Sequence, residues 1–148
     1  MKSLHLVAAV ALLTTTVAVT AQPADPIATR QALMKSNGKS IGAAMKMIKG
    51  EEPFDAAKAQ TIVADMHGVS MKFGNYFPAN SQTGGDTEAS PAIWTKPADF
   101  KAALVKFQND TAAAMAAKPA TVEAFKAAMG PVGGNCRSCH EAFRIKKD

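Results

Sequence analysis

The sequence predicts an all-α protein built as an antiparallel bundle of four helices. The chain is rich in Ala, Met, Lys and Leu, and it lacks the runs of alternating β-branched residues that indicate strands. Four segments are bounded by residues that favour helix ends. Within each segment the apolar residues recur alternately three and four positions apart, as packing in an antiparallel bundle requires.

The N-terminal segment is expected to be a secretory signal peptide. Met1-Lys2 precede an apolar run over residues 4–19, and small residues at positions 19 and 21 fit cleavage after Ala21. The longest unbroken apolar stretch, residues 6–13, is far shorter than the roughly 20 residues of a membrane-spanning helix. An uncleaved amphipathic helix or membrane anchor is the alternative. We therefore predict a signal peptide over residues 1–21 and an exported domain over residues 22–148.

The predicted mature chain is long enough for one domain. It has 127 residues, the 148 of the sequence less the 21 removed, and it needs no second domain. The signal segment holds one of the 17 basic residues and none of the 12 acidic ones, so the net charge falls from +5 to +4. Without a long run of one charge, nucleic-acid binding is not expected.

The helix boundaries follow from caps and breakers. Helix one is expected over residues 26–49, because Asp25 is a cap residue before a proline at the first helical position and Gly50 stops the helix. Helix two is expected from about residues 53–54 to residues 76–78. Residues 78–91, rich in Ser, Gly, Asn and Pro, are predicted to form a long loop.

The last two helices follow this loop. Helix three is expected to begin at residues 95–97 and to end before Lys118-Pro119. Helix four is expected to begin near Thr121, an N-cap with Glu123 in its first turn, and to run toward Lys146. Gly130-Pro131 is expected to kink or interrupt it.

The apolar repeat predicts which positions face the core. They are Ile27, Gln31, Met34, Gly38, Ile41, Met45 and Ile48 in helix one; Ala59, Ile62, Met66, Val69, Phe73 and Tyr76 in helix two; and Phe100, Ala103, Phe107, Thr111 and Ala114 in helix three. Helix four contributes Val122, Phe125, Met129, Val132, Cys136, Cys139 and Phe143. Both cysteines therefore fall on the stripe that faces the inside of the bundle.

The segment Cys136-Arg137-Ser138-Cys139-His140 carries the chemistry. An exported protein with only two cysteines would ordinarily join them in a disulfide, but the C-x-x-C-H spacing indicates covalent attachment of one haem c. The two thiols would add across the porphyrin vinyl groups, and His140 would bind the iron. Helical residues i, i+3 and i+4 share a face, so Cys136, Cys139 and His140 can meet one edge of the macrocycle.

Two other chemistries remain as alternatives for this motif. A zinc site would use Cys136, Cys139 and His140 as three ligands, but the sequence offers no second C-x-x-C or H-x-x-x-H pair to complete it. A thioredoxin-like redox pair would follow a strand in a βαβ unit, a pattern that the sequence does not show.

The motif within Cys136–Arg144, near the C-terminus of a four-helix chain, resembles the class II c-type cytochromes, the cytochrome c′ family. The resemblance extends to Arg30-Gln31 in helix one and to Ser90–Trp94 before helix three, and it is greatest to the low-spin cytochrome c-556 subgroup. It implies an up-down-up-down bundle with covalently bound haem c, an architecture for which cytochrome c′ is a standard example. It also implies a bacterial periplasmic location and often a homodimer.

Met34 is the expected sixth ligand of the iron. It lies on the core stripe of helix one, and Gly38, one turn on, is small enough to let a flat macrocycle approach. The position four residues after the Arg of Arg-Gln holds an apolar blocker in cytochrome c′, whereas the resemblance to the low-spin members implies a Met ligand there. Met34 as ordinary packing is the alternative, because the chain has eight Met. His67 is the rival donor, and we expect it to be exposed.

Two functions follow from the two coordination states. With His140 and Met34 both bound, the protein would be an electron carrier serving redox partner proteins and would not be an enzyme. With an open sixth position it would bind nitric oxide or carbon monoxide. The resemblance implies that Arg30 and Arg144 pair with the haem propionates; each is equally explained as a solvated charge at a helix surface. Trp94 is expected to pack against the end of the bundle.

Overall fold

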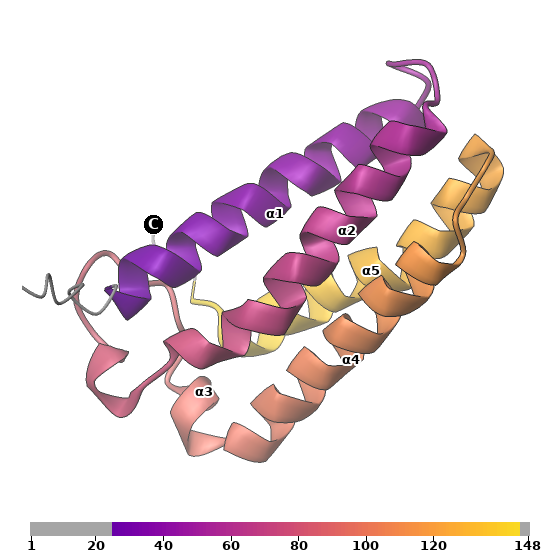
Figure 1. Ribbon diagram of the computed structural model, residues 1–148. Helices are drawn as coiled ribbons and strands as arrows, with labels where there is room; N and C mark the ends of the chain where they lie inside the picture. The colour runs from indigo at the N-terminus through magenta and orange to yellow at the C-terminus, as the bar shows by residue number, and fades with distance from the viewer. Residues whose placement is uncertain (1–24, 146–148) are drawn as a thin grey trace, which may run out of the picture.

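The structure, a computed structural model, describes residues 25–145, so the predicted signal peptide and its cleavage site lie outside the described residues. Four long helices form the bundle: α1 (Pro26–Ile48), α2 (Ala56–Phe73), α4 (Pro97–Ala116) and α5 (Val122–Phe143). A short helix α3 (Ala92–Thr95) and two 3₁₀ turns, η1 (Gly74–Tyr76) and η2 (Ala79–Ser81), lie between α2 and α4. Figure 1 shows the long helices running alternately up and down, which confirms the predicted all-α bundle.

The sequence signals at the helix starts act as expected. Asp25 accepts a hydrogen bond from the Ile27 amide at 2.9 Å, and Asp55 accepts one from the Lys58 amide at 2.9 Å. Thr121 caps α5 through the Ala124 amide at 3.2 Å. After α1, Gly50 adopts a φ of +74°, a conformation that glycine takes without steric cost. Caps therefore define where these helices begin and where α1 ends.

The last helix differs from the sequence-based expectation in two respects: it is not interrupted at Gly130-Pro131, and it ends before Lys146. Helix α5 continues through Pro131 without interruption, because Phe125, Met129 and Val132 on both sides of the proline are buried in the core while Pro131 itself is exposed. The helix ends at Phe143 rather than near Lys146, because Arg144 is extended and forms an isolated antiparallel bridge with Ala89. Within residues 25–145 this bridge is the only β-type pairing.

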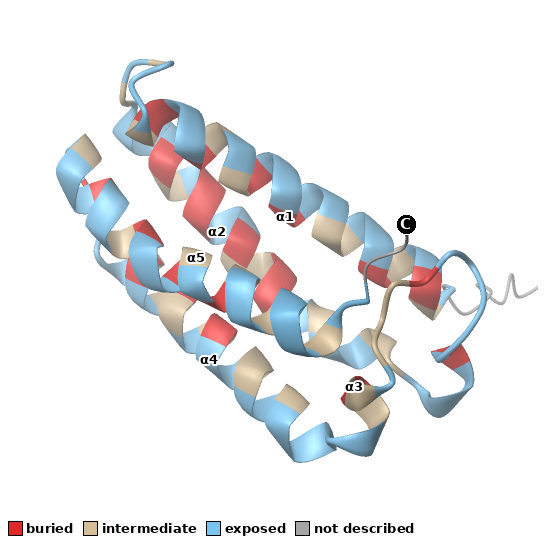
Figure 2. Ribbon diagram, turned by 180° about the vertical axis from the view of Figure 1, so that it is seen from behind, coloured by how far each residue is buried: buried red, intermediate tan, exposed pale blue. Residues whose placement is uncertain are grey.

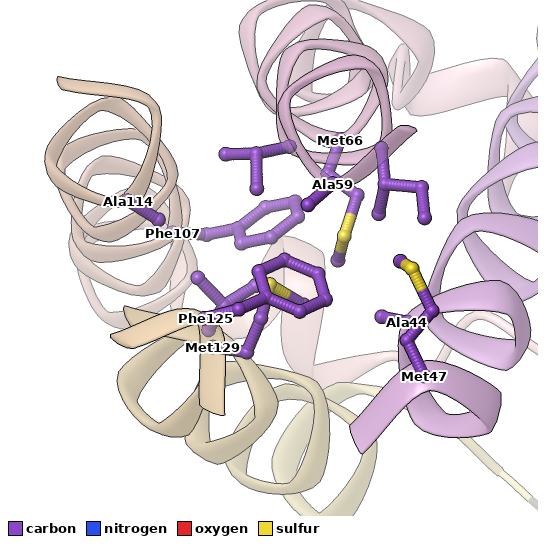
Figure 3. Close-up of a cluster of buried hydrophobic side chains, with 11 residues drawn as sticks. Ala44, Met47, Ala59, Met66, Phe107, Ala114, Phe125 and Met129 are labelled. Atoms are coloured by element: carbon purple, nitrogen blue, oxygen red, sulfur yellow. The ribbon is translucent and has the colours of Figure 1, made fainter. Parts of the chain in front are cut away.

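The apolar core occupies the end of the bundle farthest from the loop, where α1 joins α2. Figure 3 shows Phe125 and Met129 of α5 facing Phe107 of α4, Met66 of α2 and Met47 of α1. In Figure 2 the buried positions lie on the inward faces of the long helices. The contacts run in the order α1–α2, α2–α4 and α4–α5, so α1 and α5 meet directly over less of their length.

The predicted core stripe is confirmed on α2, α4 and α5. On α1, Ile27 is buried as predicted, but the other buried residues each lie one position before a predicted one. The buried residues of α1 are Ile27, Arg30, Asn37, Ser40, Ala44 and Met47. The predicted positions beside them, from Gln31 to Ile41, line a cavity instead. Across the described helices, no segment is long and apolar enough to span a membrane.

Replacing Phe125 with Ala is expected to lower the free energy of unfolding by about 3–5 kcal/mol, because a fully buried ring is removed from a packed core. Urea denaturation of the purified protein measures the change. Lys126→Ala, at the exposed neighbouring position, should alter stability by no more than about 0.5 kcal/mol. Equal effects from both substitutions would show that the core is not where the structure places it.

Candidate functional site

A cavity of about 620 Å³ opens between α1, α4 and α5 near the long loop. This volume lies within the range of roughly 300–1,000 Å³ that is typical of small-molecule and cofactor sites. Its walls are largely apolar and are formed by Ile41, Phe73, Phe77, Phe100, Leu104, Phe107 and Phe143. Loop residues 86–89 lie at its edge. The cavity is therefore shaped for a large apolar group with a polar edge.

The C-x-x-C-H motif lines this cavity from α5. Cys136, Cys139 and His140 all belong to its wall, as the helical spacing predicts. Both thiols are free and half-buried, so the two cysteines do not form a disulfide. Burial raises the pKa of the Cys136 and Cys139 thiols, which keeps both protonated near neutral pH. The thiols are thus available on the cavity wall, three residues apart on one helix.

His140 lies at the rim of the cavity, exposed on one side. Partial burial of the ring lowers the pKa of His140, and the Arg144 cation lowers it further while Glu88 opposes the change. A lowered pKa favours the neutral imidazole, which is the form that binds a metal ion. His140 can therefore offer a ring nitrogen to a group in the cavity.

Helix α1 supplies another part of the wall. Gln31, Met34, Gly38 and Ile41, four of the predicted stripe positions, line the cavity. A Cβ atom built on Gly38 would meet no other atom within 4 Å, so the wall is open at this point. Met34 and His140 therefore reach the same cavity from two different helices.

The rival donor His67 lies elsewhere. It is half-buried rather than exposed as predicted, and its Nδ1 atom lies 3.1 Å from the Thr111 hydroxyl. The Thr111 hydroxyl in turn lies 3.2 Å from that of Ser70. His67 belongs to this polar cluster between α2 and α4, and it is not among the residues that line the cavity.

Arg30 lies at the cavity but is buried, with 4% of its surface exposed, so its description as a solvated surface charge is wrong. Burial lowers its pKa, and the nearby Asp25 carboxylate opposes this. Its two terminal nitrogens donate four hydrogen bonds, to the Tyr76 carbonyl, to the hydroxyl and carbonyl of Ser81 and to the Thr87 hydroxyl, at 2.6–3.0 Å. The guanidinium also packs 4.8 Å from the Phe77 ring centre. These contacts hold the loop at Ser81 and Thr87 against α1.

Arg144 and Trp94 complete the loop end of the site. Arg144 is exposed and forms an ion pair with Glu88 of the loop. Trp94 donates from Nε1 to the Phe77 carbonyl at 3.1 Å, and its ring lies 6.1 Å from that of Phe77. Trp94 thus packs at the end of the bundle, in agreement with the prediction.

The sequence pattern did not predict two buried asparagines of the cavity wall. Asn135, 3% exposed, precedes Cys136 and donates to Asp110 Oδ2 of α4 at 2.7 Å. Asn37, 7% exposed, has a buried Oδ1 atom without a hydrogen-bond partner within the described chain. The apolar repeat could not find them because they are polar. Their spacing of three or four residues from other inward-facing positions could have indicated that they face the inside of the bundle.

Replacing Asp110 with Ala is expected to cost about 1–2 kcal/mol, because it leaves the buried Asn135 amide unpaired. Hydrogen bonds from Lys106 and Asn135 lower the pKa of the Asp110 carboxyl in the folded protein. The ionised carboxylate therefore stabilises the folded protein fully above its unfolded pKa, and this contribution is lost as the pH falls through its folded pKa. Urea denaturation at neutral and acid pH tests both statements. Asp65→Ala, at an exposed position of α2, is the control; a pH-independent difference at Asp110 would contradict the account.

Comparison with known proteins agrees with this geometry. The family model described as Cytochrome C' matches residues 25–144, which includes the motif and the Met34 wall. The chain belongs to the cytochrome c′ family. It is 42% identical over 126 residues to cytochrome c′ of Rhodopseudomonas palustris, covering 83% of this chain and 84% of that protein. It is 37% identical over 124 residues to cytochrome c-556 of Agrobacterium fabrum, covering 84% of each.

Solved structures of cytochromes c′ have the same fold as this chain. The structure of cytochrome c′ from Rhodopseudomonas palustris superposes with a TM-score of 0.80 at 40% identity, covering 85% of this chain and all of that one. Members of this family are haem electron-transfer proteins of the periplasm that bind haem c covalently. The cavity fits such a group, because it combines two free thiols, an imidazole, apolar walls and the open wall at Gly38.

Proposed function

We propose that this member of the cytochrome c′ family is a periplasmic monohaem electron carrier whose iron is low-spin and ligated by His140 and Met34. The observation that carries the proposal is the presence of Met34 and His140 on the wall of one cavity together with Cys136 and Cys139. A Met thioether and a His imidazole are the ligand pair of electron-transfer cytochromes c.

Different residues of the cavity wall would attach the haem, bind its iron and exclude water. Cys136 and Cys139 would hold the haem through two thioether bonds, each thiol S–H adding across one vinyl group, and His140 would offer its neutral imidazole to the iron. When bound, the haem supplies a one-electron iron couple, whose potential a thioether ligand raises. The aromatic wall, with Phe73, Phe77 and Phe100 among its members, limits access of water to the centre.

No enzymatic reaction is proposed for this site. The two guanidinium groups at the cavity edge are engaged in other contacts, Arg30 with the loop and Arg144 with Glu88. The pairing of Arg30 and Arg144 with the haem propionates stays a prediction. A general acid or base would need a free group placed within hydrogen-bond reach of a substrate.

The second candidate function is five-coordinate binding of nitric oxide or carbon monoxide. It is favoured by the relative at 42% identity, which bears the name cytochrome c′, whereas a relative at 37% identity bears the name cytochrome c-556. The residue that separates the two functions is Met34, because an occupied sixth position competes with a gas ligand.

Carbon monoxide uptake by the reduced protein tests the proposal. Absorption and electron paramagnetic resonance spectra should show a low-spin ferric haem, and carbon monoxide should change the ferrous spectrum little at concentrations that saturate an open haem. A high-spin ferric spectrum with ready uptake of carbon monoxide would establish the five-coordinate alternative instead.

Export and assembly belong to the same proposal. We propose that cleavage after Ala21 gives a mature chain beginning at Gln22, which exchanges electrons with redox partner proteins and forms a homodimer. N-terminal sequencing and the mass of the native protein in solution test these statements. A retained N-terminus or a monomer at micromolar concentration would contradict them.

A further inference from the structure

We propose that Arg30 is a positioning residue that keeps the iron six-coordinate by holding a strap between the helix of Met34 and the helix of His140. The strap consists of residues 77–90, between the end of η1 and the start of the α3 turn. The inference rests on the proposed His140 and Met34 ligation. Arg30 would in this way affect the coordination of the iron without contacting the haem.

The strap is joined to α1 by side-chain hydrogen bonds. Arg30 donates to the Ser81 carbonyl at 2.8 Å and to the Thr87 hydroxyl at 2.6 Å. Gln31 donates from Nε2 to the Gly85 and Asp86 carbonyls at 3.0 and 3.3 Å. The Arg30 bonds are buried, where a hydrogen bond is electrostatically stronger than in water. These hydrogen bonds therefore tie the start of α1 to the strap.

The other end of the strap is joined to the end of α5. The Ser90 amide donates to the Phe143 carbonyl at 3.0 Å, and the Ile145 amide donates to the Glu88 carbonyl at 2.9 Å. Arg144 adds an ion pair with Glu88. Figure 2 shows the chain leaving α5 beside the loop that passes the start of α1.

The attachment points lie close in sequence to the two proposed ligands. Arg30 precedes Met34 by four residues on α1, and Arg144 follows His140 by four residues at the end of α5. Direct packing between α1 and α5 is limited, since the main contacts run through α2 and α4. The strap thus connects the Met34 end of α1 to the His140 end of α5 by a shorter route than the one through α2 and α4. Loss of the strap contacts would let Met34 move away from the iron.

Arg30→Met removes the hydrogen bonds and keeps an apolar stem of similar length. Two measurements are made on the holoprotein: amide exchange at Ser90 and Ile145, and carbon monoxide uptake by the ferrous form. We expect both amides to exchange at least about tenfold faster and the apparent carbon monoxide affinity to rise about tenfold, while the amide of buried Val63 in α2 is unchanged. Lys58→Met, which breaks an ion pair with Glu52 near the α1–α2 turn, should change none of these values.

Thr87→Val is the second variant if Arg30→Met does not fold. It keeps the shape of the side chain, removes the acceptor of one Arg30 bond and of the Ala89 amide, and should shift both measurements in the same direction by a smaller factor. Faster amide exchange with unchanged carbon monoxide affinity would overturn the inference and leave the proposed function standing. Unchanged exchange in every folded variant would overturn it also. A wild-type protein that readily takes up carbon monoxide would overturn the proposed function, and the inference with it.

Discussion

Replacing Cys136 and Cys139 together with Ser is expected to abolish covalent attachment of haem. Both thiols line the cavity and are free, so each can form one thioether to the cofactor, and a serine hydroxyl forms neither bond. The mass of the denatured chain measures the result directly. Wild-type protein from a host that attaches haem to exported chains should carry the mass of one haem, and the double variant should carry none.

The control for this experiment lies inside the same motif. Ser138 is exposed, does not line the cavity and donates its hydroxyl to the Asn135 carbonyl at 3.2 Å. Ser138→Ala should therefore retain the full haem mass. A double cysteine variant that still carries covalent haem, or a wild-type chain without it, would remove the basis of the assignment.

Replacing Met34 with Leu is expected to convert the protein from a low-spin electron carrier into a high-spin protein that binds carbon monoxide. Leucine has a similar volume, so the wall of the cavity is kept while the thioether is lost. If Met34 occupies the iron in about 99% of molecules, its removal raises the apparent affinity for carbon monoxide about a hundredfold. Titration of the ferrous protein with carbon monoxide, followed by absorption, gives this ratio.

Met45→Leu is the matched control for Met34→Leu. Met45 lies three turns further along α1, is 38% exposed and does not line the cavity. Its replacement should leave the spectrum and the carbon monoxide affinity unchanged. A Met34→Leu protein with a wild-type spectrum would show that another residue is the sixth ligand.

On α1, the sequence predicted the residues that line the cavity better than the residues packed into the protein core. The repeat that includes Gln31, Met34, Gly38 and Ile41 marks the apolar side of the helix, and these residues line the cavity. The residues buried against the protein include Asn37 and Ser40, which are polar and carry no apolar signal. An apolar repeat identifies a face that avoids water, and it does not distinguish a protein partner from a cofactor.

The roles of Arg30 and Pro131 depend on long-range packing, which local patterns do not contain. The hydrogen-bond acceptors of Arg30 lie about 50 residues away in sequence, on a loop whose path is set by η2 and by the bridge to α5. Pro131 is exposed on a helix held on both sides by buried residues, so tertiary contacts offset its local effect. The C-x-x-C-H motif was predictable because all of its geometry lies within one helical turn.

The identity of the sixth ligand is tested most directly by X-ray absorption at the iron edge. We expect one sulfur atom bound to iron in the wild-type protein, contributed by Met34, and none in Met34→Leu. The thioether sulfurs of Cys136 and Cys139 would be bonded to the porphyrin and not to the iron. A wild-type iron coordinated by nitrogen or oxygen atoms alone would contradict the account.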